Sequence, residues 1–232
     1  MRNLLIGKRS CYAGNPGEWR IFIKNWKEKI PLEHSDYSIV KDISFNDLAN
    51  FDEKIIDAEK RLGILLPDSY KDFLRAITIP PGLHPSNEDF FDFSGFLNVN
   101  YIDWMGGIDG DYFNVIQGFD FHENEGEYFS YGVDFSFDHL STGFGDFLMV
   151  IAKIDVSEYL LLNTKFHSSD GEFEAAYLTP SSIVRYPNFA EMMRQFAAID
   201  CSLVDNIGPA SQISLNKIDW IGGKLISDPW WR

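Results

Sequence analysis

The sequence predicts an α+β domain, in which an N-terminal helix hairpin and a closing C-terminal helix pack on a mostly antiparallel sheet. Three observations predict this fold class. Between residues 52 and 77, apolar residues recur at helical spacing on both sides of a glycine and a proline. From about residue 90 to 180, short aromatic or β-branched runs alternate with Gly, Asn and Asp, a pattern typical of strands and turns. A last stretch, FAEMMRQFAA from residue 189, has apolar residues on one helical face.

The helix hairpin is predicted from its apolar stripes and its end signals. The first helix runs from Asp52, whose carboxylate favours a helix start, to Leu62, and Gly63 suits the left-handed conformation that often ends a helix. Pro67 fits the start of the second helix, and a Pro-Pro-Gly run ends it. The apolar positions are Phe51, Ile55, Ala58 and Leu62, followed by Tyr70, Phe73, Leu74 and Ile77.

The sheet is predicted from five runs, which are residues 112–119, 127–137, 147–154, 159–166 and 173–179. Residues 163–174 resemble a hairpin with SSDG as its turn. The closing helix begins at Pro187 or Asn188 and presents Phe189, Met192, Met193 and Phe196 on one side. Residues 18–30 have apolar residues at both alternating and helical spacings, and we predict an additional strand there.

The chain is expected to divide into three parts. Residues 1–45 form an N-terminal extension with the additional strand, residues 46–200 form the main domain, and residues 201–232 form a tail docked on it. With 232 residues, 45% of them hydrophobic, the chain can bury a packed core. No apolar run approaches the roughly 18 residues of a spanning helix, and the first residues lack the apolar core of a signal peptide. We therefore expect a cytoplasmic protein that does not bind membranes.

The charge distribution is uneven. The formal net charge is -15, and residues 76–152 contain 13 Asp or Glu but no Lys or Arg. The rest of the chain carries 20 positive against 22 negative residues, so this block holds nearly all of the net charge. It also holds 12 of the 20 Phe. Such a field repels phosphate backbones and attracts basic partners. The alternative interpretation, that the acidic face is solvated and serves only solubility, stays open.

Catalytic and metal-binding templates fit this sequence poorly. The five histidines are scattered along the sequence. The two cysteines, Cys11 and Cys201, are expected to be buried apolar side chains and not reactive thiols. We therefore predict that the protein binds neither a metal nor a cofactor. The glycine-rich GGIDGD carries no Lys for phosphate. A calcium loop starting at Asp109 and Asp111 meets Phe113 where the third ligand belongs, so we predict a turn. The sequence has no stripe of basic residues, so we do not expect it to bind nucleic acid. A small acidic hydrolase with a pair of catalytic carboxylates stays an open alternative, because a sequence does not show the distance between two side chains.

The segment IIDAEKRLGILLPDSYKDFLRAI resembles the entry signature of the SUKH superfamily. The matching positions are Glu59, Leu62, Gly63, Leu66, Pro67, Asp68, Tyr70, Phe73 and Leu74, with Trp104 as the tryptophan that follows. The strands and the closing helix extend the resemblance over residues 45–200, about two thirds of the chain. In one departure, the family often has Asn-Gly after the second helix, where this chain has TIPPGLH.

The resemblance implies an α+β binding domain without a catalytic centre. Bacterial members resemble immunity proteins that neutralise a toxin domain by binding it, whereas fungal members are regulators and scaffolds of cell-wall synthesis. The matched residues are nearly all apolar or turn-forming, so they are expected to specify the fold and not the partner.

We therefore expect the partner to bind the acidic, aromatic-rich block. A cognate toxin domain with a basic surface, such as a nuclease, is the first hypothesis, and a regulatory scaffold of the fungal type is the alternative. The oligomeric state stays open. The candidate contact residues are Asp109, Asp111, Glu123, Glu125, Glu127, Asp134 and Asp138.

Overall fold

A seven-stranded antiparallel sheet forms the centre of the protein in the computed structural model. The structure describes residues 13–32, 38–45, 51–78, 95–117, 134–136, 144–168, 170–201, 217–218 and 225–226. The strand order is β3-β6-β7-β8-β9-β5, and β4 also pairs with β6. Their bounds are β3 Gly95–Phe96, β4 Asp103–Trp104, β5 Asp134–Ser136, β6 Leu148–Asp155, β7 Glu158–His167, β8 Phe173–Leu178 and β9 Ser182–Tyr186.

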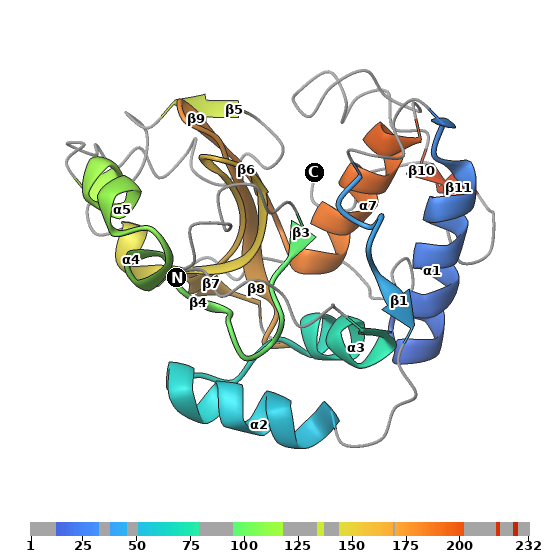
Figure 1. Cartoon of the computed structure of the whole chain (residues 1–232), viewed down its shortest axis with the longest axis horizontal. Coiled ribbons are helices and arrows are strands. Elements are labelled where there is room, and N and C mark those ends of the chain that lie inside the picture. Colours follow the sequence, from blue (N-terminus) through green and yellow to red (C-terminus); the bar gives the residue numbers. More distant parts are fainter. Residues whose placement is uncertain are drawn as a thin grey trace.

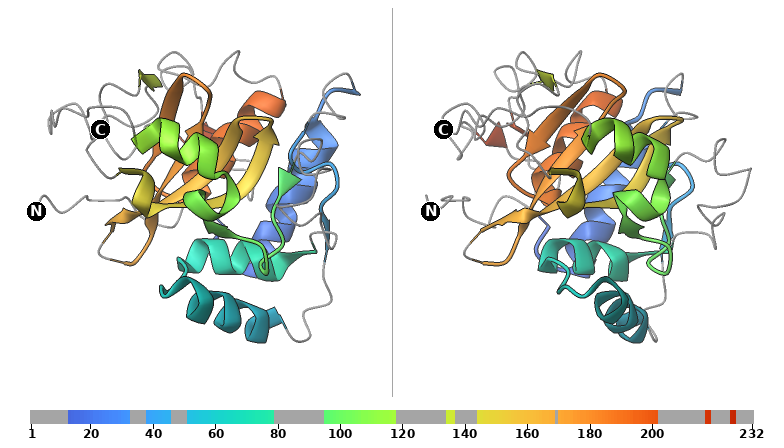
Figure 2. Two further views of the ribbon diagram at one scale, coloured as in Figure 1. Left: turned by 60° about the vertical axis from the view of Figure 1, so that its left-hand side comes forward. Right: turned by 90° about the vertical axis from the view of Figure 1, so that its left-hand side faces the viewer.

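Helices lie on both sides of this sheet, as Figures 1 and 2 show. On one side, α7 (Phe189–Asp200) packs on β8 and β9, α3 (Asp68–Ala76) packs on α7, and α1 (Pro16–Lys29) packs on α3. Helix α2 (Phe51–Leu62) lies against α3. The other side carries α4 (Met105–Ile108), α5 (Gly110–Gln117) and the 3-10 helix η5 (Phe144–Phe147). The predicted α+β class is confirmed.

The described residues also include two pairs of very short strands. Strand β1 (Ser44–Phe45) pairs with β2 (Ile77–Thr78), which directly follows α3, and β10 (Lys217–Ile218) pairs with β11 (Leu225–Ile226). No helix in the described ranges has the length and apolar character needed to cross a membrane.

The two faces of the sheet can be assigned from single contacts. The Tyr177 ring of β8 lies 5.4 Å from the Phe196 ring of α7, so the alternate side chains of β8 that include Tyr177 face α7. The opposite face meets α4 and α5, because the Tyr159 hydroxyl of β7 donates to the Asp109 carboxylate over 2.7 Å. Six successive β6 side chains, from Leu148 to Lys153, are buried, so both faces are covered.

Aromatic rings fill the core between α1, α3 and α7. The Phe73 ring lies 5.3 Å from that of Trp19, 4.8 Å from that of Phe96 and 5.1 Å from that of Phe189. Trp26 and Tyr70 are fully buried beside them. These edge-to-face and tilted contacts add to the free energy that burial of the rings provides. The N-terminal helix is therefore part of the main core.

Two strand predictions are wrong. Residues 18–29 of the predicted strand belong to α1, because Trp19, Phe22, Ile23 and Trp26 form one buried helical face and the Asn15 side chain accepts a bond from the Glu18 amide at the helix start. Residues 112–119 were predicted as a strand, but helix α5 extends to Gln117. There Ile116 is fully buried, and burial of this face outweighs the strand preference of the aromatic run.

The helix hairpin, the strands predicted at 147–154, 159–166 and 173–179 and the closing helix are confirmed. Of the run 127–137 the structure describes only β5, and α3 ends at Ala76, before the Pro-Pro-Gly run, because Ile77 begins β2. Gly63 ends α2 with a φ of 73°, and Gly171 in the turn between β7 and β8 has a φ of 81°. The Asn188 side chain caps α7 by accepting from the Glu191 amide over 2.8 Å. Strand β9 was not predicted, since its sequence SIVRY is short and follows the preceding strand almost at once.

Candidate partner-binding surface

The signature hairpin is held together by its own side chains. The Glu59 carboxylate accepts from the Leu66 amide over 2.9 Å and lies 3.7 Å from the Lys71 ammonium group. The Gly63 amide donates to the Glu59 carbonyl over 2.9 Å, which closes the last turn of α2. Glu59 therefore fixes the path of the chain from one helix to the next.

The start of α3 is capped from the sheet. Pro67 precedes the helix and has no side chain that can accept a bond. Instead, Glu172, which is buried just before β8, accepts from the Ser69 amide over 3.0 Å and also from the Ser69 hydroxyl. A carboxylate at a helix N-terminus satisfies free amides and complements the helix dipole. The sequence analysis did not single out Glu172, because its partner is 103 residues away.

The apolar signature residues are inside the protein. Leu62, Leu66, Tyr70, Phe73 and Leu74 each expose 5% or less of their surface. Trp104, in β4, is half-buried and packs against the core. The signature hairpin thus contributes the fold, and it offers a partner little apolar surface from these positions.

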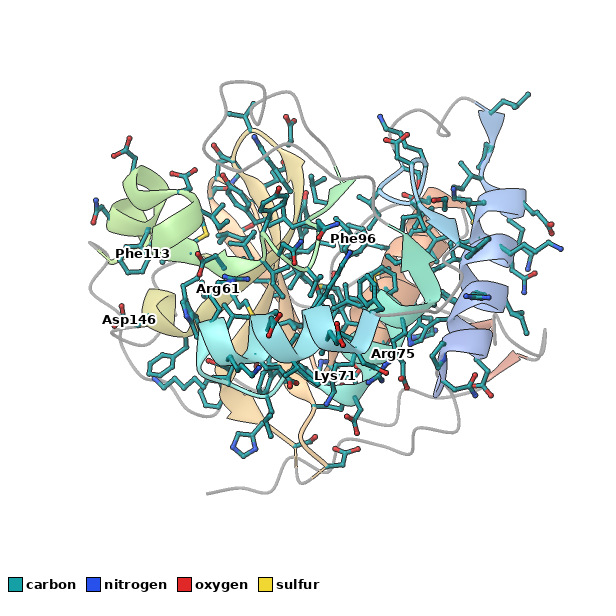
Figure 3. The ribbon with its side chains drawn as sticks, turned by 60° about the horizontal axis from the view of Figure 1, so that its bottom comes forward. Arg61, Lys71, Arg75, Phe96, Phe113 and Asp146 are labelled. Carbon is teal, nitrogen blue, oxygen red and sulfur yellow. The ribbon has the colours of Figure 1, made fainter. Side chains whose placement is uncertain are left out.

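Four carboxylates gather on the other side of the sheet, in a region that we call the acidic corner. Helix α4 contacts β4, α5 and η5, and α5 also contacts η5, so these elements form one surface. In Figure 3, Phe113 and Asp146 mark this side of the molecule. The acidic corner consists of Asp103 in β4, Asp109 between α4 and α5, Asp111 in α5 and Asp146 in η5.

Asp109 holds the acidic corner to the sheet. Its amide donates to the Met105 carbonyl over 2.9 Å, and its carbonyl accepts from the Phe113 amide over 2.9 Å, so its backbone connects α4 with α5. Its carboxylate accepts from the buried Tyr159 hydroxyl over 2.7 Å. The predicted turn is therefore a tight link between two helices, anchored to β7.

Asp111 and Asp146 are exposed. Asp111 lies in the first turn of α5, where the helix dipole favours a negative charge, and it makes no hydrogen bond or ion pair in the described part of the chain. Asp146 precedes Phe147, an exposed aromatic side chain at the end of η5. Both side chains are thus exposed to solvent on the surface of the acidic corner.

Arg61 connects the signature hairpin with the acidic corner. Its guanidinium group donates to the Ile102 carbonyl over 2.8 Å and lies 3.7 Å from the Asp103 carboxylate. Figure 3 shows Arg61 at the end of α2 that faces this corner. The turn that leads into β4 and α4 is thereby fixed to α2.

The structure brings together only some of the predicted contact residues. Asp109 is the link between α4 and α5, and Asp111 follows it in the first turn of α5. Asp134 begins β5, at the other edge of the sheet from β4, where it pairs with Val184. Glu123, Glu125, Glu127 and Asp138 lie outside the described residues. Asp103 and Asp146 were missed as contacts, although both belong to the block without Lys or Arg.

The buried polar groups behind this surface are bonded to one another. On the sheet face toward α4 and α5, the Asn163 amide group donates to the Glu174 carboxylate over 2.9 Å, and the Arg185 guanidinium lies 3.5 Å from it. In the ranges described above, no group of three or more His, Cys, Asp or Glu is placed to hold a metal ion. Cys201 is buried, and burial raises the pKa of its thiol to about 12.

Residues 51–195 match the SMI1/KNR4 family (SUKH-1), and the chain belongs to this family. The match begins at the first residue of α2 and ends within α7, so it spans the signature hairpin, the acidic corner and the sheet. Helix α1 lies outside the match, yet its tryptophans pack into the same core. No curated protein and no solved structure matches the chain.

Proposed function

We propose that this protein is an immunity protein, which neutralises a cognate toxin domain by binding it through the acidic corner in the cytoplasm. Membership of the SUKH-1 family supports a binding protein of this kind. The observation that carries the choice of surface is the acidic corner itself, which lies in a 77-residue stretch without a positive side chain. In this proposal the protein acts by occupying the toxin and has no catalytic activity of its own.

The physical basis is electrostatic competition and steering. A nuclease toxin needs a cationic surface to hold phosphate groups, and a dense carboxylate surface competes for that surface. Opposite charges also raise the rate of encounter, which matters when a toxin must be captured before it acts. Asp111 and Asp146 are the proposed direct contacts, whereas Asp103 and Asp109 are positioned by Arg61 and Tyr159. The predicted contacts outside the corner that remain part of the proposal are Glu123, Glu125, Glu127, Asp134 and Asp138.

The test uses charge reversal at the corner against charge reversal elsewhere. We expect Asp111→Lys with Asp146→Lys to weaken binding of the cognate toxin domain, which is to be sought among the products of neighbouring genes, by about 10-fold or more, since like charges then face each other. The control is Glu28→Lys with Glu53→Lys, two exposed residues on α1 and α2 that give the same change in net charge. Affinity is measured at two salt concentrations, and survival of toxin-expressing cells is scored in parallel.

The possible results separate the alternatives. Equal affinity and equal salt dependence for the corner variant, the control variant and the unchanged protein would reject the acidic corner as the interface. A protein that never protects cells from the neighbouring toxin, but retains proteins of the cell-wall synthesis machinery, would favour the regulatory scaffold. Turnover of a glycoside substrate by the purified protein would favour the hydrolase.

A further inference from the structure

We propose that the Phe147 ring is the aromatic anchor of the partner interface and that it receives an arginine side chain of the partner protein, which takes the place of Lys165 of this chain. The inference rests on the proposed function, because it names the contact chemistry of the same surface. The observation that carries it is a cation of this chain already lying over an exposed ring at the edge of the acidic corner.

The backbone of Phe147 is fixed by a hydrogen bond, while its ring is exposed to solvent. Its carbonyl accepts from the Thr164 hydroxyl over 3.2 Å, which fixes the end of η5 to β7. The side chain nevertheless exposes 39% of its surface, an unusual exposure for a large apolar residue in a helix that contacts α4, α5 and β7. A fixed, exposed ring loses little conformational entropy on binding, which is a property of interface anchors.

The ring of Phe147 is a cation site in the free protein. The Lys165 ammonium group lies 5.7 Å from the Phe147 ring centroid and 5.7 Å from that of Phe166. These distances lie within the roughly 6 Å over which an aromatic face attracts a cation. An exposed contact of this kind shifts an equilibrium only about two- to fivefold, so another cation can compete for the face of the ring.

The surroundings favour a positively charged replacement. Asp146 is the neighbour of Phe147 in η5, and Asp111 lies on α5, which contacts η5. A guanidinium group suits the site better than an ammonium group, because it is planar, weakly hydrated, and able to stack on the ring while donating to a carboxylate. The occupant is therefore an arginine of a protein, consistent with the enrichment of arginine at the centre of interfaces.

The test uses short capped peptides of alternating glycine and arginine, with matched lysine and citrulline peptides as probes of charge and shape. We expect the arginine peptide to shift the backbone amide resonances of residues 144–147 and 164–166, the lysine peptide to bind more weakly, and the uncharged citrulline peptide to leave them unchanged. Lys165→Met removes the competing cation and should tighten arginine-peptide binding about two- to fivefold. Phe147→Leu, which keeps the apolar volume, should weaken it by a similar factor.

A matched control is available in Phe45, which exposes 44% of its surface in β1, away from the acidic corner. Phe45→Leu should leave arginine-peptide binding unchanged. The inference is overturned if Phe147→Leu binds the peptide as tightly as the unchanged protein, or if Lys165→Met does not tighten binding. If Phe147→Leu still neutralises the toxin while charge reversal at Asp111 and Asp146 does not, the anchor is wrong and the proposed function stands. If the unchanged protein neutralises no toxin, the proposed function is wrong whatever the peptides show.

Discussion

The signature hairpin and the acidic corner treat charge in opposite ways. In α2 and α3, acidic and basic residues are nearly balanced, and four cations lie within 4 Å of a carboxylate of the same protein. These cations are Lys60, Arg61, Lys71 and Arg75. The acidic corner has four carboxylates on elements that contain no Lys or Arg. The hairpin therefore pairs its charges within the fold, whereas Asp111 and Asp146 of the corner are exposed to solvent.

The two regions also differ in what their apolar residues do. The hairpin buries its aromatic residues in the core, whereas Phe147 beside the corner remains exposed. This difference explains why the hairpin sequence identifies the family but does not identify the partner. Residues that set a fold are constrained by packing, and a surface residue is constrained by whatever it binds. Substitutions in each region should accordingly have different consequences.

The largest expected effect is in the hairpin core. Phe73→Ala removes a fully buried ring that contacts Trp19, Phe96 and Phe189, and should lower the free energy of unfolding by about 3–5 kcal/mol. Urea denaturation followed by tryptophan fluorescence measures this change. Ile56→Ala, on the exposed face of α2, should stay within about 0.5 kcal/mol of the unchanged protein. A loss for Phe73→Ala that is as small as the loss for Ile56→Ala would show that the stability of this core does not depend on the Phe73 ring.

Local rules predicted the hairpin, because its information is contiguous. Gly63 and Pro67 mark helix ends within a few residues, and the apolar spacing defines the buried face without reference to the rest of the chain. The same rules failed at α1 and α5. In both segments, the aromatic residues favour a strand locally. The helix forms because its buried face packs against another helix, α3 in the case of α1 and α4 in the case of α5.

The acidic corner was predicted only in part, because contacts over long sequence distances assemble it. Asp109 and Asp111 were recognisable from their local acidic sequence, whereas Asp146 joins them through contacts of η5 with α4 and α5. The same holds for Arg61, whose bond to Ile102 spans 41 residues, and for the Glu172 cap of α3. The lack of Lys and Arg in residues 76–152 was the available signal for Asp103 and Asp146.

Two glycines offer a smaller and cleaner comparison of the regions. A Cβ added at Gly63 or at Gly110 would meet no atom within 4 Å, but only Gly63 has a left-handed backbone, with a φ of 73°. Gly63→Ala should therefore lower the free energy of unfolding by about 1–2 kcal/mol. Gly110→Ala, at the start of α5, should leave it unchanged or raise it by up to about 0.5 kcal/mol. Thermal unfolding of both variants measures the difference, and a similar result for both would mean that the turn of the hairpin relaxes without strain.

The smallest expected effects come from two tyrosines that differ in hydrogen bonding. The Tyr159 hydroxyl donates to Asp109 of the acidic corner, so Tyr159→Phe should cost about 1 kcal/mol of stability and loosen the link between α4 and α5. The Tyr70 hydroxyl of the hairpin is buried without a hydrogen-bond partner in the described structure, and burial raises its pKa, so it stays protonated.

Tyr70→Phe should therefore leave stability unchanged or raise it by up to about 1 kcal/mol, because it removes a polar atom that loses its water on folding and gains no bond. Urea denaturation of both single variants and of the double variant measures these changes, which should add because the two tyrosines lie on different elements. A stabilised Tyr70→Phe variant would mean that the signature tyrosine serves the free protein through its ring alone. A loss as large as that of Tyr159→Phe would instead show that the Tyr70 hydroxyl is bonded in solution. In that case, the contrast between Tyr70, which packing alone stabilises, and the Asp109 link, which a hydrogen bond stabilises, would no longer hold.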